Sequence, residues 1–323
     1  MTSEAVSQAS VRPDLTIIMP VHCGERWIDA TLRSVAAEAT DRLELIVVDS
    51  SPSPATLEIA RRYADRVRLQ LHKCPDLLSW QAKTKFAVSI ASSAHICWLH
   101  QDDVWLPGRA TTVYRWIDTA PEAALHLAPT AIIDARDRRL GTWHCPLPEG
   151  RPLPREMLLS RLLVQNFIST PAPVFTKVAW ESCGGIDNTL WYTADWDLWL
   201  KLASMGPVIY HNEITTGFRV HGDSLTVKGS RDIDDFTWQM ETVLNRHLSS
   251  FDGCSRAVER AARASIKVNA ALAAAAAGHS RHMIGAGAAV LALGPCGVAA
   301  YLRDSRLVER ITPRLKAQLR GAF

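Results

Sequence analysis

The chain has 323 residues, 47% of them hydrophobic, which is enough for one large domain or for a large and a small one. Charged residues make up 21% and the formal net charge is only +3, so composition argues against a nucleic-acid-binding protein. The seven cysteines are scattered and form no Cys-x-x-Cys pair. They indicate reduced thiols in a cytoplasmic protein rather than a disulfide framework or a zinc site.

Two segments bear on whether the chain is associated with a membrane. Residues 1–14 are polar and predict a flexible tail. Residues 283–302 have the length of a membrane span and carry no charge. Because this segment is rich in Ala and Gly and contains Gly294-Pro295, we predict a buried helical hairpin broken at that point. A membrane span is the alternative.

Strands and helices alternate in the first hundred residues. Apolar runs or alternating patterns predict strands at 15–21, 43–48, 67–71 and 96–99. Apolar residues at helical spacing predict helices between them, beginning near residues 28, 56 and 80. This order predicts an open, mostly parallel α/β sheet.

The alternation of predicted strands and helices is less regular after residue 120. The predicted elements are a strand at 124–134, a Pro-rich loop at 140–154, a helix within 191–205, and strands at 208–210 and 214–220. From about residue 232 only helical segments rich in Ala, Leu and Arg appear. We therefore expect a catalytic domain at 15–230 and a helical region at 231–323 that docks on it.

Acidic residues follow two of the predicted strands. Asp49 ends one, and Asp102 and Asp103 follow another. Ligands of open α/β sheets bind at the carboxyl ends of the strands, so we expect these carboxylates to share a crevice and a divalent cation. Such a cation suits a transferase that releases a charged diphosphate. Alternatively, Asp102 and Asp103 only open a helix that begins near Pro107.

The stretch 191–200 offers a candidate base. Asp195 lies at a predicted helix start, where the helix dipole favours an ionised carboxylate, as a general base requires. The alternative is a helix cap, with Asp197 pairing with Lys201 one turn later. Further along, strand alternation places Arg219 and His221 on one side, suited to phosphate or metal. Without the other motifs, Arg219 and His221 would be interpreted as ordinary surface residues.

Five segments in order carry a family resemblance: LTIIMPVH, ELIVVD, HQDDVWLP, APVFTKVAWESCGGID and ADWDLWLKL. Over residues 15–226 the chain resembles the family-2 glycosyltransferases, which have the GT-A fold. QDDVWLP is most similar to the rhamnosyltransferase-like branch of polysaccharide-assembly enzymes.

The resemblance implies an inverting, Mn²⁺- or Mg²⁺-dependent transfer from a UDP- or dTDP-linked sugar to a hydroxyl of a glycan, lipid-linked or other acceptor. It assigns Pro20, His22 and Glu25 to the nucleotide edge, Asp49 to the base, Asp102 to ribose and phosphate, Arg219 to the diphosphate, Asp103 and His221 to the metal, and Asp195 to catalysis.

Five positions depart from the family pattern: His100 replaces an acid, Ala194 a Glu, His22-Cys23 a Tyr-Asn pair and Ser50 an Asp. One alternative is therefore a catalytically inactive nucleotide-binding relative that acts as a scaffold. A sugar nucleotidyltransferase is a third reading, but it requires a Gly-rich phosphate loop, and residues 22–26 contain one glycine.

Residues 303–320 mix Arg and Lys with Leu307, Ile311 and Leu315, which predicts a basic amphipathic helix kinked at Pro313. This helix is a candidate peripheral contact with the inner face of the cell membrane.

Overall fold

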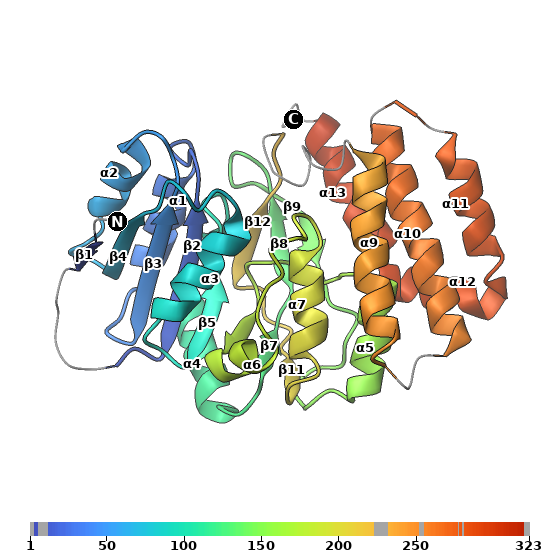
Figure 1. Cartoon of the computed structure of the whole chain (residues 1–323), viewed down its shortest axis with the longest axis horizontal. Coiled ribbons are helices and arrows are strands. Elements are labelled where there is room, and N and C mark those ends of the chain that lie inside the picture. The colour runs from blue at the N-terminus through green and yellow to red at the C-terminus, as the bar shows by residue number, and fades with distance from the viewer. Residues whose placement is uncertain are drawn as a thin grey trace.

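The computed structural model describes residues 3–5, 12–222, 232–251, 255–276, 278–279 and 281–319. A large sheet flanked by helices, a smaller second sheet and a bundle of helices follow one another across the molecule (Figure 1).

The larger sheet has eight strands in the order β1-β4-β3-β2-β5-β10-β7-β11. Their bounds are β1 Ser3–Ala5, β2 Leu15–Val21, β3 Leu43–Asp49, β4 Arg68–Lys73, β5 His95–Trp98, β7 Leu125–Leu127, β10 Val174–Thr176 and β11 Val208–Tyr210. β4, β3, β2 and β5 are parallel neighbours. The mostly parallel sheet predicted from the sequence is therefore confirmed.

Helices cover both faces of this sheet, which explains the continuous apolar runs of β2 and β3. On one face, α3 (Trp80–Ile90) shares a core cluster with Ile18 and Ile46. On the other, α1 (Ile28–Ala36) and α4 (Arg109–Thr119) pack with Ile17 and Leu45. α2 (Ala55–Arg61) precedes β4, which lies between β1 and β3 in the sheet.

The strand predicted at 124–134 is two strands in different sheets. β7 belongs to the large sheet, and β8 (Thr130–Ile133) belongs to a second sheet in the order β6-β12-β8-β9. Pro129 lies between them and has no N–H to continue a ladder. The other strands are β6 Val104–Trp105, β9 Arg139–Trp143 and β12 Thr216–Arg219. β9 thus occupies the first part of the predicted Pro-rich loop.

The small sheet positions the acidic turn. Asp102 and Asp103 lie between β5 of the large sheet and β6 of the small one. β12 pairs with both β6 and β8, which brings the end of β12 beside that turn.

The helical region is α9 Ile233–Leu248, α10 Arg256–Ala276, α11 His282–Leu291, α12 Gly294–Ser305 and α13 Leu307–Leu319. α9 packs on α7 (Ala194–Leu202), and α10 packs on α5 (Arg155–Val164). Met240 and Leu244 of α9 share a core cluster with Trp199 of α7. The helices therefore dock on the α/β region through a common core. The predicted boundary at 230 falls outside the described residues.

The break predicted at Gly294-Pro295 is confirmed. α11 and α12 meet at 116°, and Gly294 adopts a positive φ of 73°. The predicted burial is wrong, because α11 rests on α10 by one side only and leaves Ile284 and Leu291 exposed. Among the described residues, no single helix has the length and apolar character of a span; only this bent pair reaches them together. α13 continues through residue 313 as one helix.

Candidate active site

Asp195 is the second residue of α7 and lies half-buried. Its Oδ1 accepts a hydrogen bond from the N–H of Trp196 (2.7 Å), and its Oδ2 accepts one from Nδ2 of Asn166 (3.1 Å). Burial raises the pKa of Asp195 to about 6, although both hydrogen bonds oppose the shift. A carboxyl with this pKa is still mostly ionised at neutral pH, as the sequence-based prediction requires. The N-cap position belongs to Thr193.

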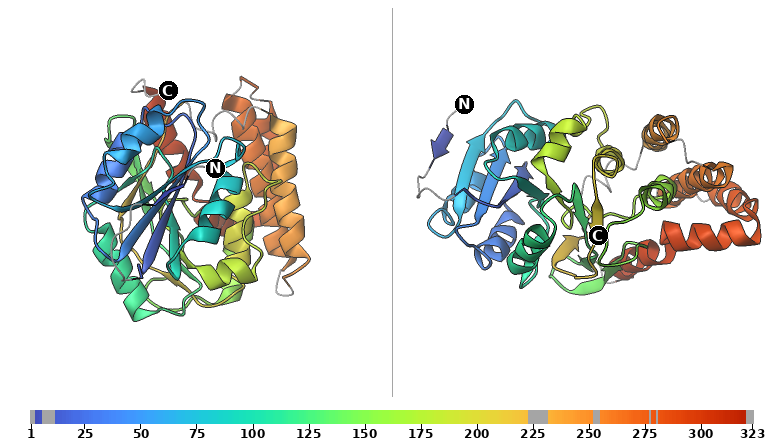
Figure 2. Two further views of the ribbon diagram at one scale, coloured as in Figure 1. Left: turned by 60° about the vertical axis from the view of Figure 1, so that its left-hand side comes forward. Right: turned by 90° about the horizontal axis from the view of Figure 1, so that it is seen from below.

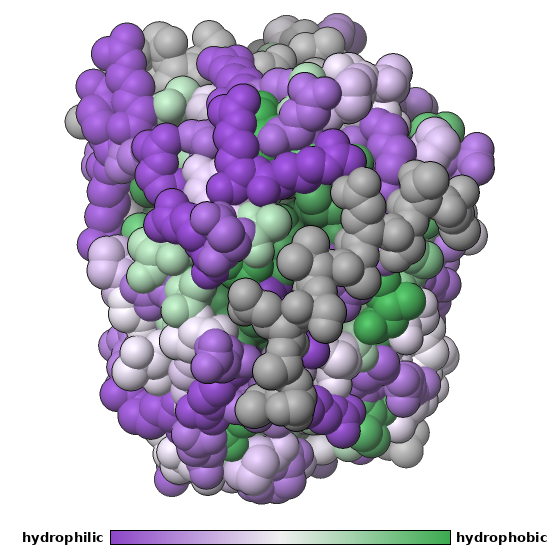
Figure 3. Space-filling view, turned by 90° about the vertical axis from the view of Figure 1, so that its left-hand side faces the viewer, coloured by the Kyte–Doolittle hydropathy of each residue, from purple (hydrophilic) through white to green (hydrophobic). Residues whose placement is uncertain are grey.

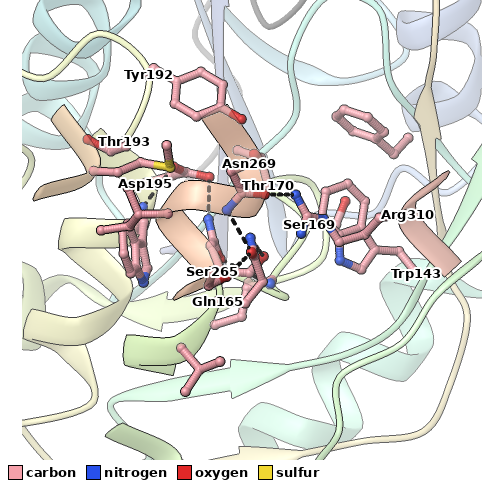
Figure 4. A pocket seen from close by; sticks show the side chains of 17 residues that line it. Trp143, Gln165, Ser169, Thr170, Tyr192, Thr193, Asp195, Ser265, Asn269 and Arg310 are labelled. Carbon is pink, nitrogen blue, oxygen red and sulfur yellow. Dashed lines mark hydrogen bonds between the residues drawn. The ribbon is translucent and has the colours of Figure 1, made fainter. Parts of the chain in front are cut away.

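Asp195 lines a cavity of about 120 Å³ (Figure 4). The α/β region supplies Asn166, Ser169, Thr170, Tyr192, Thr193 and Trp143 to its wall, and the helical region supplies Met240, Ser265, Asn269 and Arg310. In Figure 4, Asp195 lies at one side of the cavity and Arg310 at the other. Aromatic, amide and hydroxyl side chains therefore surround the candidate base.

A hydrogen-bonded chain joins the two regions at this cavity. Oε1 of Gln165 accepts from Oγ of Ser265 (3.0 Å) and from Nδ2 of Asn269 (2.9 Å). Nη2 of Arg310 donates to Oδ1 of Asn269 (2.7 Å). Sequence reasoning missed these residues, since Gln165 and Asn269 are about a hundred residues apart and neither belongs to a motif.

The structural role predicted for Asp197, an ion pair with Lys201, is confirmed. Asp197 is fully buried, and it pairs with Lys201 (2.7 Å), Arg246 (2.9 Å) and His247 (2.9 Å). Burial opposes the shift, but hydrogen bonds from His247 and Lys201 and the charges of Lys201 and Arg246 lower the pKa of Asp197 to about 2. It therefore ties α7 to α9.

The acidic turn faces His221. Nε2 of His221 lies 2.9 Å from Oδ2 of Asp102, and the His221 ring packs on Trp27 with centroids 4.9 Å apart. Burial would raise the pKa of Asp102, but the hydrogen bond with His221 and the neighbouring His100 lower it. Within the described part of the chain, Nδ1 of His221 and Nε2 of His100 are buried and have no hydrogen-bond partner. Asp102 and His221 therefore form one polar pair.

Asp103 and Arg219 point into the protein instead. Oδ1 of Asp103 accepts the N–H of Arg219 (3.0 Å), and burial and the charge of Asp102 raise the pKa of Asp103 well above its usual range. The Arg219 side chain is 2% exposed. It donates to the carbonyls of Asp102 (2.7 Å) and Asp134 (2.9 Å) and pairs with Asp137 (2.7 Å). Both residues thus brace the turn, and Asp102 rather than Asp103 faces His221.

Asp49 is similarly engaged by the protein. Its buried carboxylate accepts the N–H of Ser51 (2.8 Å) and pairs with Nζ of Lys73 (3.0 Å). The sequence indicated neither partner. Of the three carboxylates expected to share one crevice, Asp49 and Asp103 are buried and Asp102 is partly exposed. The shared crevice stays a prediction.

The predicted nucleotide edge surrounds the end of β2. Pro20 is buried within β2, whereas His22 and Glu25 are exposed. The N–H of His22 donates to Oε1 of Gln101 (2.9 Å), and Nε2 of Gln101 donates to the His22 carbonyl (3.1 Å). A Cβ on Gly24 would lie 2.8 Å from that same Gln101 oxygen, so the Gln101 side chain would have to shift. Two hydrogen bonds therefore connect the residue that follows β2 with Gln101, next to the acidic turn.

Lys83 was also missed by sequence reasoning. It is buried in α3, and its Nζ donates to the carbonyl of Val21 (2.7 Å). Burial lowers its pKa to about 8, although the charge of Asp49 opposes the shift. A cation thus lies beneath the strand ends.

Comparison with known sequences identifies the class of protein. The family described as glycosyl transferase family 2 matches residues 16–181, about half of the chain. The chain therefore belongs to glycosyl transferase family 2 and is a glycosyltransferase enzyme.

Relatives agree with this assignment. An uncharacterized glycosyltransferase of Rickettsia prowazekii is 22% identical over 230 residues, which cover 69% of this chain and 69% of that protein. A chondroitin synthase of Pasteurella multocida is 22% identical over 67% of this chain but only 22% of its own length.

Solved structures share the fold. TarS of S. aureus (residues 1–349) has a TM-score of 0.55 at 14% identity and covers 80% of this chain and 81% of that one. A Pyrobaculum calidifontis mannosyltransferase in complex with GDP-Man and Mn²⁺ has a TM-score of 0.50 at 17% identity. The match covers 95% of this chain and 87% of the mannosyltransferase. The GT-A fold is thus confirmed.

Proposed function

We propose that this chain moves a sugar from a nucleoside-diphosphate sugar to an acceptor hydroxyl with inversion, and that Asp195 is the general base. The observation that carries the proposal is a half-buried carboxyl with a pKa of about 6 in the wall of a cavity. Such a group is mostly ionised at neutral pH and still basic enough to take a proton in the transition state.

The chemistry needs one displacement. An oxygen of Asp195 takes the proton of the acceptor hydroxyl while that hydroxyl attacks the anomeric carbon. The bond to the diphosphate breaks on the opposite face of the sugar, so the configuration inverts. A positioned base contributes about 10²–10⁴-fold to the rate. Asn166 holds the Asp195 carboxylate in place.

The donor would lie at the carboxyl ends of β2, β3 and β5, where ligands of such sheets bind. Pro20, His22, Glu25 and Asp49 border this edge. Fold neighbours crystallised with UDP-GlcNAc and with UDP support a nucleotide-sugar donor. From the family resemblance we favour UDP- or dTDP-sugars. The rhamnosyltransferase-like branch remains a prediction.

A divalent cation would suit Asp102 and His221. One carboxylate and one imidazole nitrogen lie 2.9 Å apart, and Mn²⁺ and Mg²⁺ complete such partial sites with phosphate oxygens and water. The described residues hold no cluster of three or more His, Cys, Asp or Glu, so the donor diphosphate would complete the site. When bound, the cation would neutralise charge on the departing diphosphate. This assignment replaces Asp103 with Asp102.

The cavity beside Asp195 would receive the acceptor. Aromatic rings, amides and hydroxyls in one wall are suited to a carbohydrate, and relatives named chondroitin and hyaluronan synthases support a glycan acceptor. Because Asn269 and Arg310 line the same cavity, the helical region would take part in acceptor recognition.

Thermal unfolding with UDP, dTDP or GDP, with and without Mn²⁺, tests the donor and cation assignments. A nucleotide at 100 times its Kd should stabilise the protein by about 2.7 kcal/mol. We expect UDP or dTDP to stabilise most, Mn²⁺ to increase the shift, and Asp102→Asn to remove that increase. No shift with any nucleotide at millimolar concentration would refute the donor assignment, and a shift insensitive to EDTA would refute the cation. Donor binding without transfer would favour the inactive relative.

A further inference from the structure

The outer side of α11 is apolar and unpartnered by the described residues. α11 packs on α10 through Ala286 and Val290. On the other side, Ile284 is 81% exposed and Leu291 is 75% exposed. Seven residues apart, these two side chains lie on the same side of the helix, with Ala288 between them. We call this surface, made by Ile284, Ala288 and Leu291, the α11 face.

The α11 face lies at one extremity of the molecule. α11 and α12 are at the opposite end from β1–β4 (Figures 1 and 2). The far end, drawn in Figure 3, is mainly hydrophilic, with smaller apolar areas between charged and polar side chains. The exposed Ile284 and Leu291 therefore lie at the opposite end of the molecule from this mainly hydrophilic face.

The helical segment of the chain that contains the α11 face is basic in sequence. Residues 255–323 contain eleven Lys and Arg against three Asp and Glu, whereas the whole chain has a net charge of only +3. No acidic residue occurs from 260 to 303. Arg281 immediately precedes α11, and Arg260 donates to the carbonyl of Ala292 at its other end. Positive side chains thus border the apolar face at both ends.

We infer that the α11 face is a docking surface for a membrane that contains anionic lipid. Its apolar side chains enter the boundary between headgroups and acyl chains, and Arg260 and Arg281 meet the lipid phosphates. A second copy of the chain fits less well, since pairing two such faces would bring two basic regions together. Attachment is peripheral, because α11 and α12 are bent by 116° and α11 stays packed on α10.

This surface differs from the basic tail predicted from the sequence. α13 packs on β9, and its Arg310 lines the cavity of the candidate active site. The docking surface does not depend on the proposed catalytic role of Asp195, so the two are tested separately.

Co-sedimentation of the purified full-length chain with vesicles tests this inference. We expect binding to vesicles of phosphatidylcholine with phosphatidylglycerol, and weaker binding to phosphatidylcholine alone or at high salt. The double variant Ile284→Glu/Leu291→Glu should reduce the affinity at least about tenfold, since burying one such side chain is worth more than that factor. Val178→Glu on α6 (Lys177–Ser182), at a site 71% exposed, should leave binding unchanged.

Three results would overturn the inference: no binding to either vesicle, equal binding by the double variant, or a dimer in light scattering that the double variant dissociates. The last result would assign the face to a second copy. The thermal midpoint of each variant serves as the folding control. If the double variant is destabilised, Ile284→Ser/Leu291→Ser replaces it, with the same expected direction.

Discussion

The side-chain amide of Asn166 donates a hydrogen bond to Oδ2 of Asp195 over 3.1 Å. Asn166 follows α5 and Asp195 begins α7, so this contact fixes the candidate base relative to the wall of its cavity. The same hydrogen bond favours the ionised carboxylate and opposes the effect of burial on its pKa.

Removing this contact should shift the pH dependence of catalysis. Asp195 must be ionised to act as a base, so kcat/KM should rise with pH through a pKa of about 6. Asn166→Ala removes a hydrogen bond to the charged form, which raises the pKa, so the acidic limb should move to higher pH. Ser169→Ala, which lines the same cavity, is the control. An unchanged limb in Asn166→Ala would mean that another group titrates.

The variant Arg219→Lys distinguishes a structural role of Arg219, in holding the acidic turn, from a role in binding phosphate. Lysine lacks the planar fork that reaches two carbonyls and Asp137, so we expect a loss of about 2–5 kcal/mol in unfolding free energy. Urea unfolding measures this loss. A stable variant with a raised donor KM would instead show that Arg219 contacts the diphosphate.

Asp197→Asn should destabilise the protein through the junction of α7 and α9. It leaves Lys201 and Arg246 without their buried counter-charge, a loss of about 3–5 kcal/mol in urea unfolding at pH 7. Because the pKa of Asp197 is lowered to about 2, the stabilisation is complete above pH 4 and is lost as the pH falls toward 2. Asp187→Asn, which removes a partner of Arg246 that is partly exposed, should cost less.

Arg310→Ala tests whether the helical region recognises the acceptor. Arg310 lines the cavity and holds Asn269, so we expect a higher acceptor KM with donor affinity unchanged. Arg256→Ala, on the exposed start of α10, is the matched control. Equal acceptor KM values for Arg310→Ala and wild type would place the acceptor elsewhere.

The parallel strands could be predicted from sequence because their signal is local. β2 and β3 are buried on both faces, so each reads as an apolar run, and Asp49 marks the end of one. The split at Pro129 could not be predicted in the same way, because apolar residues continue on both sides while the strands join different sheets.

The candidate site residues could be predicted from motifs, but the residues that contact them could not. Asp195 and the acidic turn stand out as residue types at strand or helix ends. The partners that decide their chemistry are distant in sequence: Asn166 for Asp195, the N–H of Arg219 for Asp103, and Lys73 for Asp49. The same limit applies to α11, whose apolar sequence predicted burial, although among the described residues only one side of the helix has a packing partner.

The rate of sugar transfer by Asp195→Asn tests the central claim most directly. Asparagine keeps the shape of the side chain but cannot take a proton from the acceptor. Single-turnover kinetics with saturating donor should show a fall of at least about 10²-fold, with nucleotide affinity nearly unchanged. A variant that transfers sugar at the wild-type rate would contradict the assignment of Asp195 as the base.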